Sequence, residues 1–184
     1  MLKEFLKNYR DKNLFQIRKQ VYKLIEKNLR VLDFGYGDGE LLRILSPKIS
    51  YGLGIDKNKK KIEFAKQLIK KAGIKNLELE VADAGINLNK KFDYSILMLV
   101  LHSFDYNSQI KILNYAEKDS DKLIIVDFDL PAKRNLLINL DEILAGHYKN
   151  FRNYLRNGRV ETLVAGNSIE KFDTCKDYLK IWIL

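Results

Sequence analysis

Five short apolar runs alternate with segments of helical periodicity through the middle of this 184-residue chain, and this alternation constrains its fold most strongly. The apolar runs, each bounded by turn residues, cover residues 30–34, 50–55, 77–82, 92–101 and 122–128. Helical patterns fill residues 39–46, 58–72 and 107–118, with Gly73 expected at the C-cap of the second and Asn107 as the N-cap of the third. Repeated strand and helix predicts an α/β fold, a mostly parallel sheet with helices on both faces.

The two ends of the chain depart from this rhythm. The pattern of residues 1–29 predicts two short helices, whereas residues 166–184 read as a pair of strands. Between the fifth strand and this pair, residues 132–165 are predicted to be largely helical and carry an aromatic stripe that includes Tyr148 and Phe151. Because α/β proteins build ligand sites after strand carboxyl ends, this helical segment is expected to cover a site. The alternative is an amphipathic crossover whose aromatics belong to the core.

Length and composition favour one cytoplasmic domain over residues 1–184, with 30–128 as its ligand-binding core. The single cysteine, Cys175, cannot form an internal disulfide, and the opening MLKEFLKNYR lacks the apolar stretch of a signal peptide. The longest strongly apolar run, ILMLVL at 96–101, is far shorter than the roughly 20 residues that cross a bilayer. No membrane span is therefore expected.

The chain is basic, with 33 Lys and Arg against 24 Asp and Glu and a net charge of +9. Such a charge attracts RNA, anionic membrane surfaces or acidic substrates, and it does not choose among them. The densest run, KNKKK at 57–61, continues into a helical pattern without interleaved aromatics. We interpret its lysines as a solvated helix face, and a nucleic-acid patch is the alternative.

The stretch VLDFGYGDGE at 31–40 places three glycines after an acid at the end of the first predicted strand. The dinucleotide fingerprint G-x-G-x-x-G requires its third glycine at the position of Glu40, so the spacing argues against NAD. The carboxylate of Asp33 would also repel a pyrophosphate resting on the glycine turn. The predicted ligand of this turn is therefore not a phosphate.

Acids follow the first three predicted strands, at Asp33, Asp56 and Asp83. The ends of parallel strands share one edge of the sheet, so a ligand lying there would meet three carboxylates and the glycine turn in an otherwise basic protein. This arrangement suits a cationic ligand rich in hydrogen-bond donors. S-adenosylmethionine has this character, with an ammonium, a sulfonium, two ribose hydroxyls, an adenine amine and no phosphate.

Four segments in order, DFGYGDG at 33–39, GID at 54–56, ADA at 82–84 and FDYSILMLVLHSF at 92–104, resemble the class I S-adenosylmethionine-dependent methyltransferases. The resemblance covers most of the chain. It implies a Rossmann-like, seven-stranded sheet whose last strand, YLKIWIL, is antiparallel and inserts beside the fifth. The cofactor-binding residues that it implies are Asp33, Gly35, Tyr36, Gly37 and Gly39 for the methionine moiety, Asp56 for the ribose with Lys57 beside it, Asp83 and Ala84 for the adenine, and Leu99 for the pocket wall.

Residues that could handle the methyl acceptor follow the fourth strand and lie in the helical segment. His102 stands where similar proteins carry the histidine of a V-L-H-H-like sequence, and it is either a general base or a positioning residue. His147, Tyr148 and Phe151 are the candidate substrate-binding residues, although His147 could equally be an ordinary surface side chain. Neither a metal site nor a role for Cys175 is assigned.

The resulting functional prediction is an enzyme that methylates a small molecule. The N-P-P-Y type signature of methyltransferases acting on amino groups of DNA or protein glutamine is absent, since LVLHSF stands in its place. A separate RNA-binding module is not evident either. The alternatives are an RNA methyltransferase that uses its basic surface and a non-catalytic, cofactor-binding subunit that stabilises or regulates an active partner.

Overall fold

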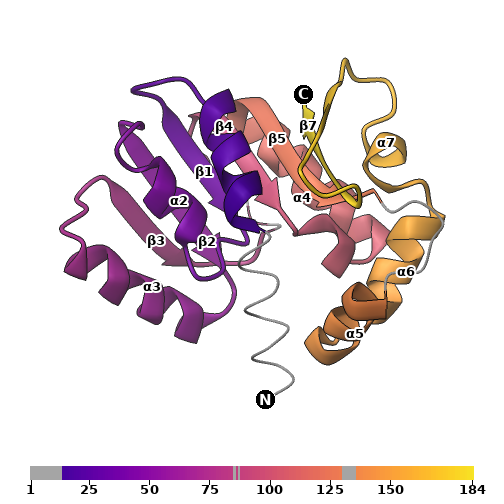
Figure 1. Ribbon diagram of the computed structural model, residues 1–184. Helices are drawn as coiled ribbons and strands as arrows, with labels where there is room; N and C mark the ends of the chain where they lie inside the picture. The colour runs from indigo at the N-terminus through magenta and orange to yellow at the C-terminus, as the bar shows by residue number, and fades with distance from the viewer. Residues whose placement is uncertain (1–13, 85, 87, 130–135) are drawn as a thin grey trace.

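The computed structural model describes residues 14–84, 86, 88–129 and 136–184, and its centre is a seven-stranded sheet within these ranges (Figure 1). The strands are β1 (Arg30–Phe34), β2 (Tyr51–Asp56), β3 (Leu77–Val81), β4 (Phe92–Met98), β5 (Ser120–Phe128), β6 (Glu170–Asp173) and β7 (Leu179–Ile183). Their order is β3-β2-β1-β4-β5-β7-β6. The first five pair in parallel, and β7 runs antiparallel to both β5 and β6. The predicted fold, including the insertion of the last strand beside the fifth, is confirmed.

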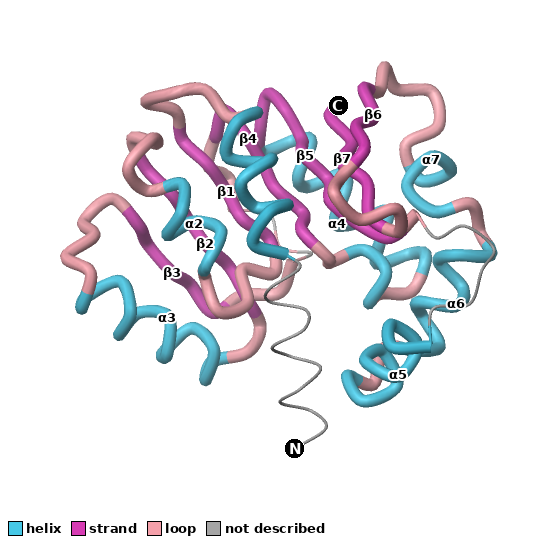
Figure 2. Tube along the Cα trace, in the orientation of Figure 1, coloured by secondary structure: helices cyan, strands magenta, loops and turns pink. Residues whose placement is uncertain are grey.

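Helices connect the strands and cover the sheet (Figure 2). A helix over residues 14–24 precedes β1, and residues 1–13, where another helix is predicted, lie outside the described ranges. The remaining helices are α2 (Glu40–Leu45), α3 (Lys59–Lys71), the 3₁₀ turn η1 (Leu101–Ser103), α4 (Tyr106–Asp119), α5 (Leu136–Ala145), α6 (Tyr148–Arg156) and α7 (Arg159–Leu163). The predicted helical segment after β5 is therefore three short helices in its described part.

Two predicted helix ends are shifted by one or two residues. The N-cap of α4 is Asp105 rather than Asn107, because the Asp105 carboxylate accepts hydrogen bonds from both the backbone N–H and the hydroxyl of Ser108. Gly73, expected at the C-cap of α3, is the residue after the cap, Ala72. Its φ of 67° gives the left-handed turn that commonly ends a helix.

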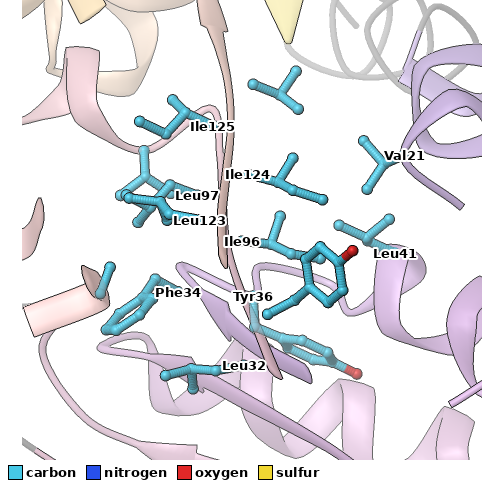
Figure 3. Close-up of a cluster of buried hydrophobic side chains, with 14 of the residues drawn as sticks. Val21, Leu32, Phe34, Tyr36, Leu41, Ile96, Leu97, Leu123, Ile124 and Ile125 are labelled. Atoms are coloured by element: carbon cyan, nitrogen blue, oxygen red, sulfur yellow. The ribbon is translucent and has the colours of Figure 1, made fainter. Parts of the chain in front are cut away.

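The central strands are buried on both faces, which is why their sequences are almost continuously apolar. Successive residues alternate between the faces, so Ile96 and Ile124 lie on one side of the sheet and their neighbours on the other. Figure 3 shows Val21 of the first helix and Leu41 of α2 on the side of Ile96 and Ile124. The opposite face of β4 and β5 packs against α4, which Figure 1 shows behind the sheet.

The carboxyl ends of β1, β2 and β4 meet at one edge, as parallel strands must, and the loops that follow them lie together there. Figure 2 shows α5 and α6 beside this edge, and α6 contacts η1 directly. The fold therefore brings the glycine turn, the histidine after β4 and the α5–α6 segment to the same region. None of the described helices is long and apolar enough to cross a membrane.

Candidate active site

A cavity of about 850 Å³ opens at the carboxyl edge of the sheet. Its walls come from the glycine turn after β1, the end of β2 and the start of α3, the segment from β4 to η1, helix α5 and the helix over 14–24. Of the predicted cofactor-binding residues, those that line it are Asp33, Gly35, Tyr36, Gly37, Asp56, Lys57 and Leu99. His102 and His147 line it as well, so the fold gathers most of the predicted site into one space.

Two glycines of the glycine turn have different surroundings, one packed against a side chain and one bordering open space. Tyr36 folds its ring beneath the turn, where a Cβ added to Gly39 would lie only 1.8 Å from the Tyr36 hydroxyl oxygen. A side chain at Gly39 would therefore be strained and would displace the Tyr36 ring, and Gly39 does not line the cavity. Gly37 differs, because it has a φ of 62° and, among the described residues, only the Gly35 carbonyl oxygen lies within 4 Å of an added Cβ, at 3.7 Å. Its backbone borders open space and can approach a ligand closely.

Asp33 places a buried carboxyl group in the cavity wall. Its side chain is 3% exposed, and none of the described residues donates a hydrogen bond to it. Burial raises the pKa of Asp33 to about 8. The positive charge of Arg18 lowers this pKa, and the negative charges of Asp56 and Asp38 raise it. A buried acid with no donor is costly when ionised, so this position favours a cationic ligand group.

Asp56, at the end of β2, is tied to the glycine turn. Its Oδ2 atom accepts a hydrogen bond from the backbone N–H of Gly37 at 2.9 Å, and its Oδ1 atom accepts one from the N–H of Asn58 at 2.8 Å. Each carboxylate oxygen keeps a further lone pair. Asp56 therefore holds the turn in place and can still accept hydrogen bonds from ligand hydroxyls.

Leu99 follows β4 with an unusual backbone conformation. Its φ is 57°, a left-handed value that costs energy for a residue with a side chain, and its N–H donates to the Val126 carbonyl oxygen at 2.7 Å. The strained turn ends β4 at Met98, three residues before the predicted end at residue 101. It also directs the chain into η1 and leaves Leu99 in the cavity wall.

The predicted adenine contacts lie away from this space. Asp83 is exposed and Ala84 is buried, and neither lines the cavity. On the same side of the site, Lys57, Lys60 and Lys61 do line it. The Lys57 ammonium lies 5.4 Å from the centre of the Phe104 ring, so this side chain reaches from the β2–α3 connection towards the residues after η1.

His102 is buried between two acids. Its Nδ1 atom lies 2.7 Å from Oδ1 of Asp127, and its Nε2 atom lies 3.5 Å from Oε1 of Glu142. Burial alone would lower the pKa of His102, but the charges and hydrogen bonds of Asp127 and Glu142 raise it to about 10. The imidazole is therefore protonated at neutral pH. A histidine in that state cannot accept a proton, so the geometry favours a positioning role over that of a general base.

His147 lies at the turn between α5 and α6 and differs from His102 in exposure and charge. Its side chain is 41% exposed, and its Nδ1 atom lies 4.0 Å from Oε2 of Glu142. The pKa of His147 is lowered from its usual value by burial and by the positive charges of His102, Lys57 and Lys61, while Glu142 opposes this shift. His147 is therefore neutral at neutral pH.

The aromatic stripe of the helical segment belongs largely to the core. Phe151 is fully buried, and its ring meets the rings of His102 and Phe128 at centroid distances of 6.0 and 5.1 Å. Tyr154 is buried too and donates a hydrogen bond to the Phe128 carbonyl oxygen. Neither Phe151 nor the half-buried Tyr148 lines the cavity. For Phe151, this placement agrees with the core alternative rather than with substrate contact.

Sequence reasoning missed Arg18, Asp127 and Glu142. Arg18, from the first helix, lines the cavity and forms an ion pair with Glu40. Asp127 interrupts the apolar run of β5, and an acid inside a buried strand is a signal for a buried partner. The signal for Glu142 is Gly146, a residue type that commonly ends a helix in a left-handed conformation. Such an end turns the next residue, His147, back towards the last turn of α5, where Glu142 lies.

The chain is similar to known proteins in sequence pattern and in structure. Residues 25–176 match a family model described as a methyltransferase domain. A SAM-dependent methyltransferase from Aquifex aeolicus shares 16% identity and a TM-score of 0.68, over 98% of this chain and 96% of that one. An rRNA methylase from Streptococcus thermophilus shares 10% identity and a TM-score of 0.61, over 93% and 94% of the two chains. At these identities the solved structures show a common fold. Curated proteins show no significant match to the sequence.

Proposed function

The chain belongs to the methyltransferase-domain family and uses S-adenosylmethionine as its methyl donor, and we propose that it methylates a small molecule. The observation that carries this proposal is the continuity of the cavity. One space of about 850 Å³ reaches from Asp33 and the glycine turn to Glu142 and His147 under α5. Its volume lies in the range of small-molecule sites, and its lining combines apolar walls with a few convergent polar groups.

The residues in the wall fit the cofactor. Asp33, buried and without a hydrogen-bond donor among the described residues, matches the ammonium group, and Asp56 retains lone pairs for the ribose hydroxyls. Gly37 allows close backbone approach, and Lys57 and Leu99 complete the adjoining wall. When bound, S-adenosylmethionine supplies the electrophilic methyl carbon. For Asp83 and Ala84, which lie outside the cavity lining, contact with the adenine has no comparable support.

The chain's own contribution to transfer is alignment and exclusion of water. In-line displacement at a sulfonium methyl depends mainly on holding the reacting atoms in position in a water-poor space. The protonated His102 holds Asp127 of β5 and Glu142 of α5 on its two nitrogens. It thereby fixes the covering helix over the end of β4, and we assign it this positioning role.

A screen tests the acceptor class. The purified chain is incubated with radiolabelled S-adenosylmethionine and, separately, with a metabolite extract and with total RNA from which metabolites have been removed. We expect label in the metabolite fraction, and calorimetric binding of both S-adenosylmethionine and its demethylated product. Label confined to RNA would overturn the small-molecule acceptor while leaving the methyltransferase activity intact.

RNA is the second candidate acceptor, and a specific observation favours it. Lys57, Lys60 and Lys61 line the cavity on its α3 side, in a chain of net charge +9. Phosphate contacts weaken steeply with salt, so RNA binding through these lysines would fall by orders of magnitude between low and moderate ionic strength. Binding of a small acceptor inside the cavity would change little over the same range.

A further inference from the structure

We propose that His147 is the general base that removes the acceptor's proton during methyl transfer, and that Glu142 positions it. The inference rests on the proposed function, since it assigns residues to the acceptor end of the same cavity. His147 and Glu142 both line that cavity. His102, for which the sequence left the roles of general base and positioning residue open, is kept from acting as the base by its two acidic partners.

The backbone at the end of α5 brings the two side chains together. The N–H of His147 donates to the carbonyl oxygen of Glu142 at 3.0 Å, and the N–H of Gly146 donates to that of Ile143 at 3.1 Å. With Gly146 at φ 81°, these two bonds form the Schellman motif that ends many helices. The motif reverses the chain after α5, so a residue five positions along lies beside the last helical turn. The pairing of Glu142 and His147 is thus fixed by the main chain.

Glu142 has an oxygen that no described group satisfies. Its side chain is 92% buried, given an exposed fraction of 8%, and Oε1 faces His102 at 3.5 Å. The other oxygen, Oε2, has no hydrogen-bond partner in the part of the chain that the structure describes, and it lies 4.0 Å from Nδ1 of His147. That separation is longer than a hydrogen bond, and catalytic contacts of this kind often tighten only when substrate is bound. A buried, unpaired carboxyl oxygen is costly, and an imidazolium at His147 would relieve the cost.

The charges around His147 suit a base that is neutral before the reaction. The groups that act on it are Glu142 on α5, His102 on η1, Lys57 before α3 and Lys61 in the first turn of α3. Together with burial, the three cations lower the pKa of His147, while Glu142 alone opposes them. His147 can therefore take up a proton at neutral pH, and its partly exposed ring can pass that proton to solvent.

The proposed step balances in atoms and charge. An acceptor hydroxyl or amine gives its proton to Nε2 of His147 while its lone pair forms the bond to the methyl carbon of S-adenosylmethionine. The electron pair of the methyl–sulfur bond stays on sulfur, which loses its positive charge as the imidazole gains one. Nδ1–H of the resulting imidazolium then donates to Oε2 of Glu142. The acceptor class is accordingly one whose nucleophile carries a proton to be lost.

Histidine NMR on the full chain without ligand tests the pairing directly. The sequence has only two histidines, so the His147→Gln variant assigns both imidazole resonances. We expect one ring to titrate below pH 6.5 and the other to stay protonated to about pH 10. Glu142→Gln should lower the midpoint of His147, whereas the matched control Asp141→Asn, on the neighbouring position of α5, should move it less. An unchanged midpoint in Glu142→Gln would overturn the pairing.

Kinetics with the metabolite fraction that is labelled most strongly test the catalytic role. His147→Gln should lower kcat by about 100-fold or more, in the range for loss of a general base, with S-adenosylmethionine affinity within about twofold of wild type. Glu142→Gln should lower kcat and shift the acidic limb of its pH profile, and Glu142→Asp should recover part of the rate. An unaltered kcat and pH profile in His147→Gln would refute the base assignment alone. Failure of wild type to transfer label to any metabolite would instead refute the proposed function.

Discussion

Nδ1 of His102 lies 2.7 Å from Oδ1 of Asp127, and the two side chains are 4% and 0% exposed. Asp127 also accepts a hydrogen bond from the backbone N–H of His102 through Oδ2 at 3.3 Å, so one carboxyl group holds both the ring and the main chain of η1. Because β5 supplies Asp127, this contact fixes the segment after β4 to the neighbouring strand. A histidine in this setting is part of the architecture that supports the site.

Replacing His102 by Gln should therefore destabilise the protein strongly. Removing one member of a buried ion pair leaves the other uncompensated, which typically costs about 3–5 kcal/mol. The folded-state pKa of His102 is raised, so its stabilising effect is complete below about pH 6.5 and is lost as the pH rises through about 10. Thermal unfolding from pH 6 to 10 should show a declining Tm for wild type and a flatter profile for the variant.

His147→Gln provides the control for this experiment, because it removes a partly exposed histidine from the same cavity. Its Tm should stay close to that of wild type, with the same decline towards pH 10. Equal stability of the His102 and His147 variants would show that the buried pair contributes nothing to the fold.

Asp33→Asn should raise the stability of the protein at high pH and weaken cofactor binding. The folded-state pKa of Asp33 is raised to about 8, so the folded protein retains a proton that the unfolded chain releases. This difference makes stability fall as the pH rises from about 4 to about 8, and the uncharged amide removes that loss. We expect the variant to be more stable than wild type at pH 8.5 by on the order of 1–3 kcal/mol, without a gain at pH 4.

Calorimetry on the same variant tests the link to the cofactor. If the ammonium group lies against Asp33, binding near pH 7 drives this carboxyl group to ionise and releases protons, which titrations in buffers of different ionisation enthalpy detect. The proton release should vanish in Asp33→Asn. Asp38→Asn, on the same turn and half-buried, should retain it. Proton release that is identical in all three proteins would place the ammonium elsewhere.

Asp56→Ala should weaken S-adenosylmethionine binding by on the order of 1–3 kcal/mol, the scale for losing hydrogen bonds to a charged group. The loss has two sources, since Asp56 faces the cavity and also accepts the N–H of Gly37. Calorimetry measures the affinity, and circular dichroism checks that the variant is folded. Asp83→Ala is the matched comparison, because this exposed acid lies outside the cavity lining. Equal losses in the two variants would show that the adenine does extend to Asp83.

The sheet, and the meeting of the glycine turn with Asp33 and Asp56 at one edge of it, could be predicted from the sequence because both depend on local patterns. Apolar runs broken by turn residues located five strands, and an acid at or just beyond the end of each of the first three marked their shared edge. The glycine turn also stood out, although sequence alone could not separate its roles. Gly39 accommodates the ring of Tyr36, whereas Gly37 borders the open cavity.

The surroundings of His102, in the proposed acceptor end of the cavity, could not be predicted from the sequence because their contacts join residues far apart in the chain. His102 is paired with Asp127 and Glu142, which lie 25 and 40 positions away, and pairings of this kind decide whether a histidine is charged. The burial of Glu142 depends on how α5 packs over the cavity, which helical spacing alone does not show. Phe151 matched an acceptor wall as well as it matched the core, because helical spacing shows which residues share a face without showing what covers them.

Two substitutions distinguish the core-packing and cavity-lining residues of helices α5 and α6. Phe151→Ala removes a fully buried ring that packs against His102 and Phe128, so it should lower the free energy of unfolding by about 3–5 kcal/mol. Leu137→Ala removes a side chain that is 40% exposed and lines the cavity from α5, so its Tm should change little. If the acceptor binds under α5 as proposed, loss of this apolar side chain should raise the acceptor KM while S-adenosylmethionine affinity stays constant. Measuring Tm, KM and cofactor affinity for both variants distinguishes the core-packing residue, Phe151, from the cavity-lining residue, Leu137. A large fall in acceptor affinity in a still stable Phe151→Ala protein would show that Phe151 contributes to substrate binding.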